Sequence, residues 1–287
     1  MDRDVLSVIA AQSPSFSKGQ RRIAKYILDN YDKAAFMTAS RLGETVGVSE
    51  STVVRFAADI GYKGYPEMRK ALQDMIKNRL TSVQRIEVSR GIIEKDNIPA
   101  AVLSSDMEKI RATLEELDKG TFDAAVNAIV NAKHIYILGL RSSTSLASFI
   151  DFYMKLLFPH VTVLNESFAN NIFEQLMRVE EGDVFIGISF PRYSRRTIKA
   201  AQFAKDKGAT VIGITDTETS LMAQISTIKL YVKSEMVSFV DSLVAPLSLI
   251  NALIIAVSDR VEDDLSTIFQ NLEKIWSDYE VYEKSDH

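Results

Sequence analysis

Residues 38–65, TASRLGETVGVSESTVVRFAADIGYKGY, predict two short helices joined by a tight turn. Apolar residues recur at helical spacing up to Val46, and Gly47 follows where a helix end favours a left-handed residue. Ser49 is a suitable N-cap for a second helix, which we expect over residues 50–60. The side chains of that helix expected to face inward are Val53, Val54, Ala57 and Ile60.

The polar side chains of this segment match those of a DNA-reading helix. A helix-turn-helix motif places the first residues of its second helix against base edges in the major groove. Serine and threonine bond bases or phosphates, arginine pairs best with guanine, and a basic, aromatic turn suits phosphate contacts. The candidate DNA-binding residues are Ser49, Ser51, Thr52, Arg55, Lys63 and Tyr65. The alternative is an ordinary helical hairpin with a solvated polar face.

Residues 14–80 resemble the N-terminal domain of the MurR/RpiR family of bacterial transcriptional regulators. The matching segments are SKGQRRIAKY (17–26), AFMTAS (35–40), VSESTVVRF (48–56) and GYKGYP (61–66). The resemblance implies an all-helical, winged-helix-like domain that binds a double-stranded DNA operator. Pro66 is expected at the first position of a further helix that runs to about Leu80.

Length, charge and composition set further limits. The 287 residues predict about two domains. Residues 1–80 carry 13 Lys and Arg against 9 Asp and Glu, a net charge of +4, whereas residues 81–287 carry 21 against 29, a net charge of −8. A basic N-terminal part followed by an acidic remainder suits binding of the N-terminal part to a phosphate backbone. The absence of cysteine excludes disulfides and thiolate metal sites, and no cofactor is expected.

The location of the protein is also constrained by its sequence. No signal peptide is recognisable, which together with the absence of cysteine indicates a cytoplasmic protein. The longest apolar run, residues 243–257, is shorter than the roughly 20 residues that a membrane span requires, so no membrane association is expected.

From residue 134 onward, short β-rich runs alternate with helical patterns. The expected strands are 135–140, 161–164, 183–189, 210–215 and 225–232. The expected helices are 144–157, 168–178, 195–207 and 237–257, with 98–117 and 122–132 before the sheet (the latter capped by Thr121) and an amphipathic helix over 261–282 after it. This alternation predicts an α/β domain with a five-stranded parallel sheet flanked by helices.

Hydroxyl side chains and arginines cluster after three of the expected strands. Ligands of open parallel sheets bind at the carboxyl ends of the strands, where hydroxyls and helix N-termini can hold an anion. The candidate ligand-binding residues are Arg141, Ser142, Ser143, Ser189, Arg192, Tyr193, Ser194, Thr197 and Thr215. The alternative is that single serines are helix caps and that the arginines form a solvated face.

Residues 134–258 resemble the sugar isomerase (SIS) domain, a phosphosugar-binding fold. The second loop of that family usually reads Ser-x-Ser-Gly-x-Thr, with an acidic residue two positions on. This chain keeps Ser189 and differs at Pro191, Arg192, Ser194 and Arg196. Proline removes a backbone donor, and arginine supplies charge. The resemblance therefore implies a small anionic ligand, a phosphosugar or a sugar acid.

Three segments follow from these patterns. We expect a helix-turn-helix DNA-binding domain at 1–80, a linker with connecting helices at 81–120, and a SIS-type domain with a C-terminal packing helix at 121–287. Candidate catalytic bases near the loops, Glu166, Asp216 and Glu235, each fit a loop charge or a cap better, and no catalytic residue is assigned.

The predicted function is a DNA-binding transcriptional regulator of bacterial carbohydrate metabolism whose SIS domain senses an anionic sugar metabolite. A homodimer or homotetramer is expected, because helix-turn-helix proteins read two half-sites. Two alternatives remain: a sugar-phosphate isomerase-like enzyme with a helical appendage, and a helical interaction module that does not bind DNA.

Overall fold

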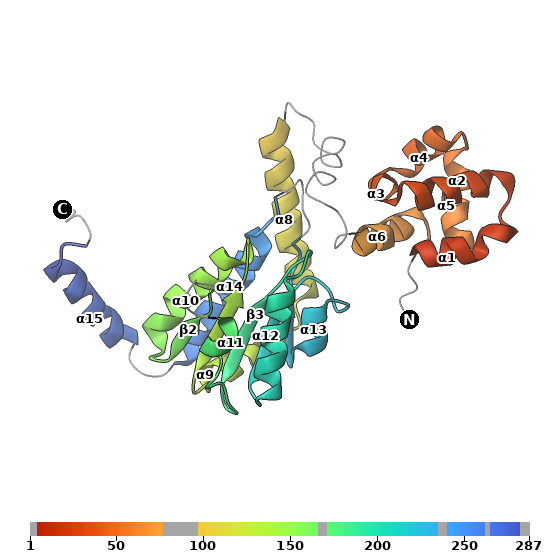
Figure 1. Ribbon diagram of the computed structural model, residues 1–287. Helices are drawn as coiled ribbons and strands as arrows, with labels where there is room; N and C mark the ends of the chain where they lie inside the picture. Colours follow the sequence, from red (N-terminus) through yellow and green to blue (C-terminus); the bar gives the residue numbers. More distant parts are fainter. Residues whose placement is uncertain (1–4, 77–96, 166–170, 235–239, 262–264, 282–287) are drawn as a thin grey trace. The chain divides into compact units, whose positions relative to one another are not determined.

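The computed structural model describes residues 5–76, 97–165, 171–234, 240–261 and 265–281 (Figure 1). The chain divides into two compact units, residues 1–103 with 236–240 and residues 104–235 with 241–287. The division falls within α8 (Ile98–Glu116), in the region expected to connect the two domains. The predicted linker before α8 lies almost entirely outside the described residues.

The described part of the first unit is helical, as predicted (Figure 1). Its helices before α8 are α1 (Val5–Gln12), α2 (Lys18–Asp29), α3 (Tyr31–Ala34), α4 (Ala39–Val46), α5 (Glu50–Asp59) and α6 (Tyr65–Ile76), with a short 3₁₀ helix at Ser13–Ser15. They enclose one apolar core, in which the rings of Phe16 and Phe56 meet edge to face at 5.2 Å. The predicted end of α6 near Leu80 lies outside the described residues.

Local signals in the sequence fix the turn between α4 and α5. Gly47 has a φ of 71°, which is the left-handed conformation that glycine adopts without strain. Gly43 is equally constrained, because a Cβ atom there would lie 2.8 Å from the carbonyl oxygen of Val48. The turn is therefore tight enough to exclude a side chain at Gly43.

The second unit contains the predicted five-stranded parallel sheet, in the order β2-β1-β3-β4-β5. Its strands are β1 (Ile135–Gly139), β2 (Val161–Val163), β3 (Val184–Ile188), β4 (Thr210–Thr215) and β5 (Ile228–Tyr231). Every residue of β1 and β3 is buried, as expected for a parallel sheet covered on both faces.

Helices cover both faces of this sheet. Two apolar clusters form, one built with α9 (Lys119–Val130), α10 (Ser143–Leu157) and α14 (Val244–Arg260), the other with α11 (Ile172–Gln175), α12 (Arg195–Asp206) and α13 (Leu221–Ile225). Within the described residues, the last helix is α15 (Leu265–Asp278). No helix within the described residues is long and apolar enough to cross a membrane.

Several predicted boundaries were wrong for local reasons. α9 begins at Lys119 because the carboxylate of Asp118, rather than Thr121, caps it and accepts from the Thr121 backbone N–H at 2.7 Å. The strand predicted from residue 225 begins only at Ile228, because Ile225 is the last residue of α13, the short helix that Ser220 caps. The ends of three other predicted helices, at 168–170, 237–239 and 282, lie outside the described residues.

Candidate functional site

The start of α5 is organised by three hydroxyl side chains. The Oγ atom of Ser49 accepts from the backbone N–H of Thr52 at 3.3 Å, so Ser49 is the N-cap that the sequence predicts. The same atom lies 2.8 Å from the hydroxyl oxygens of both Ser51 and Thr52. These candidate DNA-binding hydroxyls therefore stabilise the helix start and hold one another in place.

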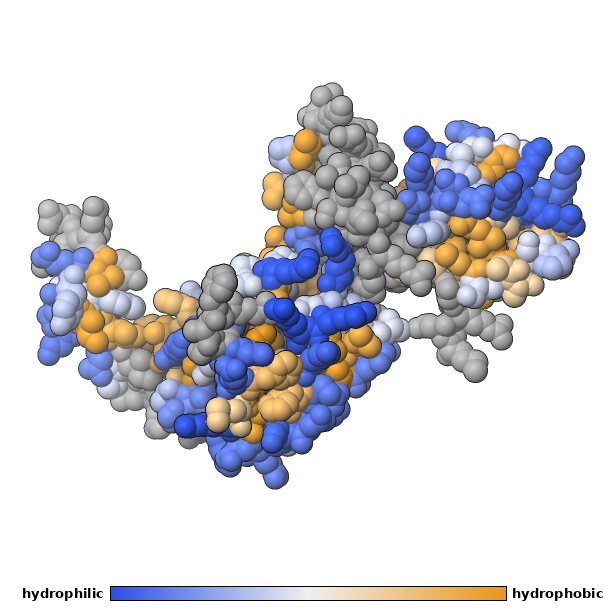
Figure 2. Space-filling model, in the orientation of Figure 1, coloured by the Kyte–Doolittle hydropathy of each residue, from blue (hydrophilic) through white to orange (hydrophobic). Residues whose placement is uncertain are grey.

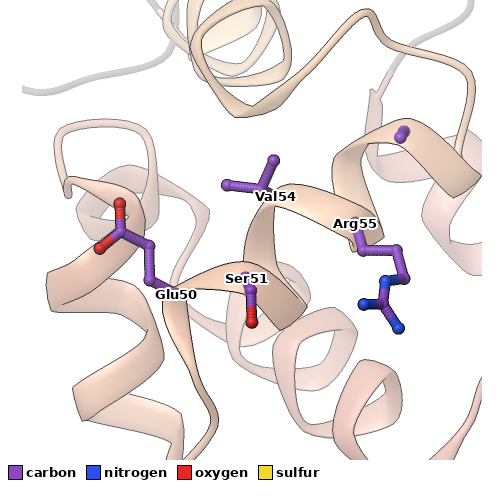
Figure 3. Close-up of a pocket in the computed structure, with 5 residues that line it drawn as sticks. Glu50, Ser51, Val54 and Arg55 are labelled. Carbon is purple, nitrogen blue, oxygen red and sulfur yellow. The ribbon is translucent and has the colours of Figure 1, made fainter.

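An open hollow lies along the outer surface of α5. It has a volume of about 540 Å³, and its lining residues are Glu50, Ser51, Val54, Arg55 and Ala58. Figure 3 shows the side chains of four of them projecting from the helix. The structure thus brings Ser51 and Arg55 together at one exposed surface.

The prediction that Val54 faces inward is wrong, since this residue is 42% exposed. At about 100° per residue, Val54 lies well away from the buried stripe that passes through Val53, Phe56 and Ala57. Its apolar character alone does not decide its direction.

The turn after α5 gives different roles to Lys63 and Tyr65. Lys63 is exposed, and its backbone N–H donates to the carboxylate of Glu67. Tyr65 is buried, and its hydroxyl donates to the carbonyl oxygen of Met37 at 2.9 Å. Burial raises the pKa of Tyr65 to about 12. The structure does not support a phosphate contact by Tyr65, because its hydroxyl is buried and already donates to the Met37 carbonyl.

The loop after β1 carries the first group of candidate ligand residues. Gly139 passes so close to α10 that a Cβ atom there would lie 2.4 Å from the carbonyl oxygen of Ser143. Arg141 adopts a φ of 58° and is exposed. The hydroxyl of Ser142 donates to Asp241 at 3.2 Å, a contact that sequence spacing could not reveal. Ser143 is buried.

The loop after β3 and the first turn of α12 each carry a buried hydroxyl without a hydrogen-bond partner among the described residues. They are Ser189 Oγ and Thr197 Oγ1, and these two residues are 3% and 0% exposed. The backbone of Ser189 is fixed, because its N–H donates to Ile214 and its carbonyl accepts from Thr215. A ligand oxygen would supply what these hydroxyls lack, since buried polar groups in proteins are rarely left unpaired.

Other candidates in these loops have structural tasks. The hydroxyl of Tyr193 donates to Asp216 at 2.7 Å, and Ser194 caps α12 by accepting from the Thr197 N–H at 3.3 Å. The hydroxyl oxygen of Thr215 lies 2.8 Å from the Ser189 carbonyl oxygen and 3.0 Å from the hydroxyl oxygen of Ser220. These contacts shape the loops around the unpaired hydroxyls.

The parallel pairing of β1, β3 and β4 places the three candidate loops at the same edge of the sheet. Arg192 lies in the middle loop and is exposed, with a φ of 66°. A further residue at this edge was missed from the sequence. Ser234 follows β5, is buried, and has an unpaired hydroxyl within the described part of the chain. A lone serine after a predicted strand gives no signal of this kind.

The described histidines lie at the opposite edge. His134 precedes β1, its Nε2 lies 2.8 Å from the Thr162 hydroxyl, and its ring stacks on Tyr136 at 4.3 Å. Burial lowers the pKa of His134. Of the candidate bases, Asp216 accepts from Tyr193, and Glu166 and Glu235 lie outside the described residues. No group of three potential metal ligands occurs among the described side chains.

Comparison with known families assigns both parts of the chain. The model of the helix-turn-helix domain of the rpiR family matches residues 3–79, and the SIS domain model matches residues 128–256. An HTH-type transcriptional regulator of Caldanaerobacter subterraneus is 27% identical over 96% of this chain and 97% of its own length. The regulator HexR of Pseudomonas aeruginosa is 26% identical, covering 74% of this chain and 73% of its own.

Two solved structures share the fold. The sugar isomerase domain of an RpiR transcription factor from Sphaerobacter thermophilus matches with a TM-score of 0.58 and 26% identity, over 61% of this chain and 98% of that one. NanR of Vibrio vulnificus, solved with ManNAc-6P, matches with a TM-score of 0.56 and 21% identity, over 96% of this chain and 98% of that one. With its helix-turn-helix unit and its five-stranded SIS domain, the chain belongs to the RpiR family of transcriptional regulators.

Proposed function

We propose that the protein binds a DNA operator through α5 and senses an anionic sugar metabolite, such as a phosphosugar, at the carboxyl edge of its SIS sheet. The observation that carries the sensing proposal is the pair of buried hydroxyls at Ser189 and Thr197, which have no hydrogen-bond partner in the part of the chain that the structure describes. Each would cost about 1–3 kcal/mol if it stayed without a partner. A ligand that accepts both hydrogen bonds would recover that free energy.

The charge of the ligand is inferred from the arginines of the same edge. Arg141 and Arg192 are exposed in the loops that follow β1 and β3. A guanidinium binds phosphate or carboxylate through paired donors. NanR, which has a similar fold, was solved with the phosphosugar ManNAc-6P, and we propose a ligand of this class here.

The DNA-binding proposal rests on the exposed surface of the first unit. Arg55 reaches solvent from the second turn of α5, and Lys63 follows in the next turn of the chain. Arginine suits guanine in the major groove and lysine suits phosphate. The net charge of +4 over residues 1–80 adds a general attraction to DNA.

A homodimer or homotetramer would couple the two functions. Ligand binding would favour one spacing of the paired DNA-binding units, which shifts the population between two operator affinities. An exposed apolar stripe on α8 supports self-association, and Figure 2 shows hydrophobic residues along this helix. Its residues are Leu103, Met107, Ile110 and Leu114.

We propose that sensing proceeds without turnover of the ligand. An isomerase requires a positioned base, and Asp216 is held by the Tyr193 hydroxyl. At the acidic position of the familiar SIS loop, this chain has Arg196, whose charge cannot remove a proton.

Fluorescence anisotropy with DNA from upstream of the gene tests the proposal. Binding should survive scrambled competitor DNA and weaken steeply with salt, and a phosphosugar such as ManNAc-6P should change the affinity. The double variant Ser189→Ala with Arg192→Ala should remove the sugar response and keep DNA binding. The matched control is Ser258→Ala with Arg178→Ala, which changes the same residue types outside the candidate loops and should retain both. Equal loss of both activities in the first variant would argue against a separate sensory site.

A further inference from the structure

The outer surface of α5 combines an apolar centre with polar neighbours. Val54 and Ala58 are exposed and stand one helical turn apart, so their side chains are neighbours on the helix. Glu50, Ser51 and Arg55 line the same open hollow (Figure 3). An exposed valine is unremarkable by itself, but this valine lies among the side chains proposed to face DNA bases.

We infer that Val54, supported by Ala58, recognises the 5-methyl group of thymine in the operator. The methyl group is the one apolar feature that a base pair presents in the major groove, and proteins read it through apolar contact. Val54 is a specificity-determining residue in this inference, which rests on the proposed DNA-binding function.

The geometry of valine suits this task. A β-branched side chain in a helix has essentially one preferred χ1 conformation, so its two methyl groups keep a fixed direction. The start of α5 is itself held by the Ser49 hydroxyl, which bonds to the backbone and the hydroxyl of Thr52. A rigid apolar surface on a fixed helix can distinguish thymine from uracil or cytosine by shape.

The charges around the hollow favour DNA over an apolar protein partner. Arg55 can donate to a guanine, and Glu50 can accept from the amino group of a cytosine, so the apolar centre is enclosed by groups that match base edges. A contact of this kind excludes water from Val54 and leaves the neighbouring polar groups paired.

The test uses the full-length protein and removes one methyl group from the DNA at a time. Selection from a random duplex library first supplies a preferred sequence, and each thymine in it is then replaced by uracil. The affinity of the wild type should fall about fourfold when thymine is replaced at one or two positions. Burying one carbon group contributes ~0.8 kcal/mol, and a tenfold change in affinity corresponds to about 1.4 kcal/mol.

The variant Val54→Ala should lose most of the difference in affinity between the thymine and uracil duplexes while keeping its thermal unfolding temperature. Val244→Ala is the matched control, because Val244 is 40% exposed but belongs to α14 of the second unit. This control should prefer the thymine duplex over the uracil duplex by the same factor as the wild type.

The possible failures are distinguishable. Enrichment of a sequence whose thymines can all become uracil without loss of affinity would overturn the role of Val54 and leave DNA binding intact. If Val54→Ala kept the full thymine preference, the inference would also be refuted. Failure to enrich any sequence would overturn the proposed DNA-binding function and this inference with it.

Discussion

Replacing Tyr65 with phenylalanine should destabilise the helix-turn-helix unit at neutral pH. The substitution keeps the buried ring but removes the hydroxyl that donates to the Met37 carbonyl at 2.9 Å. Leaving that carbonyl without a partner costs about 1–3 kcal/mol. For a unit of this size, each kcal/mol lowers the midpoint of thermal unfolding by roughly 4–8 °C. Calorimetry should show one transition moved down by at least about 4 °C.

Alkaline pH should reduce the difference between wild type and the Tyr65→Phe variant. The pKa of Tyr65 is about 12 in the folded unit against an ordinary value of 10.0. Between these values the unfolded chain loses the proton first, so the stability that this group contributes is complete below pH 10 and falls as the pH rises toward 12. At pH 11 the wild type should have lost about 1.4 kcal/mol of its free energy of unfolding, because one pH unit above the unfolded pKa corresponds to about 1.36 kcal/mol.

Calorimetry at pH 7 and pH 11 on both proteins separates these effects from the general weakening of proteins in alkali. The matched control is Tyr153→Phe, which alters a tyrosine that is 37% exposed on α10. That control should leave the helix-turn-helix transition unchanged. A shift of less than 1 °C for Tyr65→Phe, or the same difference between the two proteins at both pH values, would contradict the proposed role of the Tyr65 hydroxyl.

Three further substitutions give distinct readouts. Arg55→Ala should cost about 1–3 kcal/mol in DNA binding and relax the sequence preference, measured by anisotropy against operator and scrambled duplexes. Lys63→Ala should instead weaken binding to all sequences and reduce the slope of log affinity against log salt by about one. Gly139→Ala should lower the thermal midpoint of the second unit, because the added Cβ would meet the Ser143 carbonyl oxygen at 2.4 Å. An unchanged midpoint would show that α10 can move away at little cost.

The architecture could be predicted because several local signals agree. Gly47 and Ser49 mark the end of one helix and the start of the next, and both have the predicted conformations. The β-rich runs of the second unit correspond to five parallel strands, since nearly continuous apolar runs separated by helices are typical of a covered sheet. The boundaries were less predictable, as at the start of α9, because Asp118 and Thr121 are both residue types that can cap a helix.

The directions of individual side chains could not be predicted in the same way. Val54 is apolar, yet it lies about a quarter turn from the buried stripe and reaches solvent. Tyr65 has a polar tip, and the Met37 carbonyl that satisfies it is 28 positions away in the sequence. In both cases the position on the folded helix, rather than the residue type, decides the environment.

In the candidate ligand loops, too, position rather than residue type decides the environment of a hydroxyl. Ser189 and Ser194 are five residues apart in one loop and chemically identical. Ser194 caps α12, whereas Ser189 has a buried oxygen without a partner among the described residues. The sequence predicts the loop, and the structure distinguishes the cap from the candidate ligand contact.

Arg192, with its φ of 66°, has a consequence for protein engineering. A left-handed backbone costs an ordinary residue roughly 1–2 kcal/mol, and glycine avoids that cost. Arg192→Gly should therefore remove this backbone cost, while it removes a charge from the proposed sensory edge. The backbone at this position favours glycine, and the proposed response to sugar favours arginine. Backbone conformation and metabolite response would thus favour opposite residues at this one position.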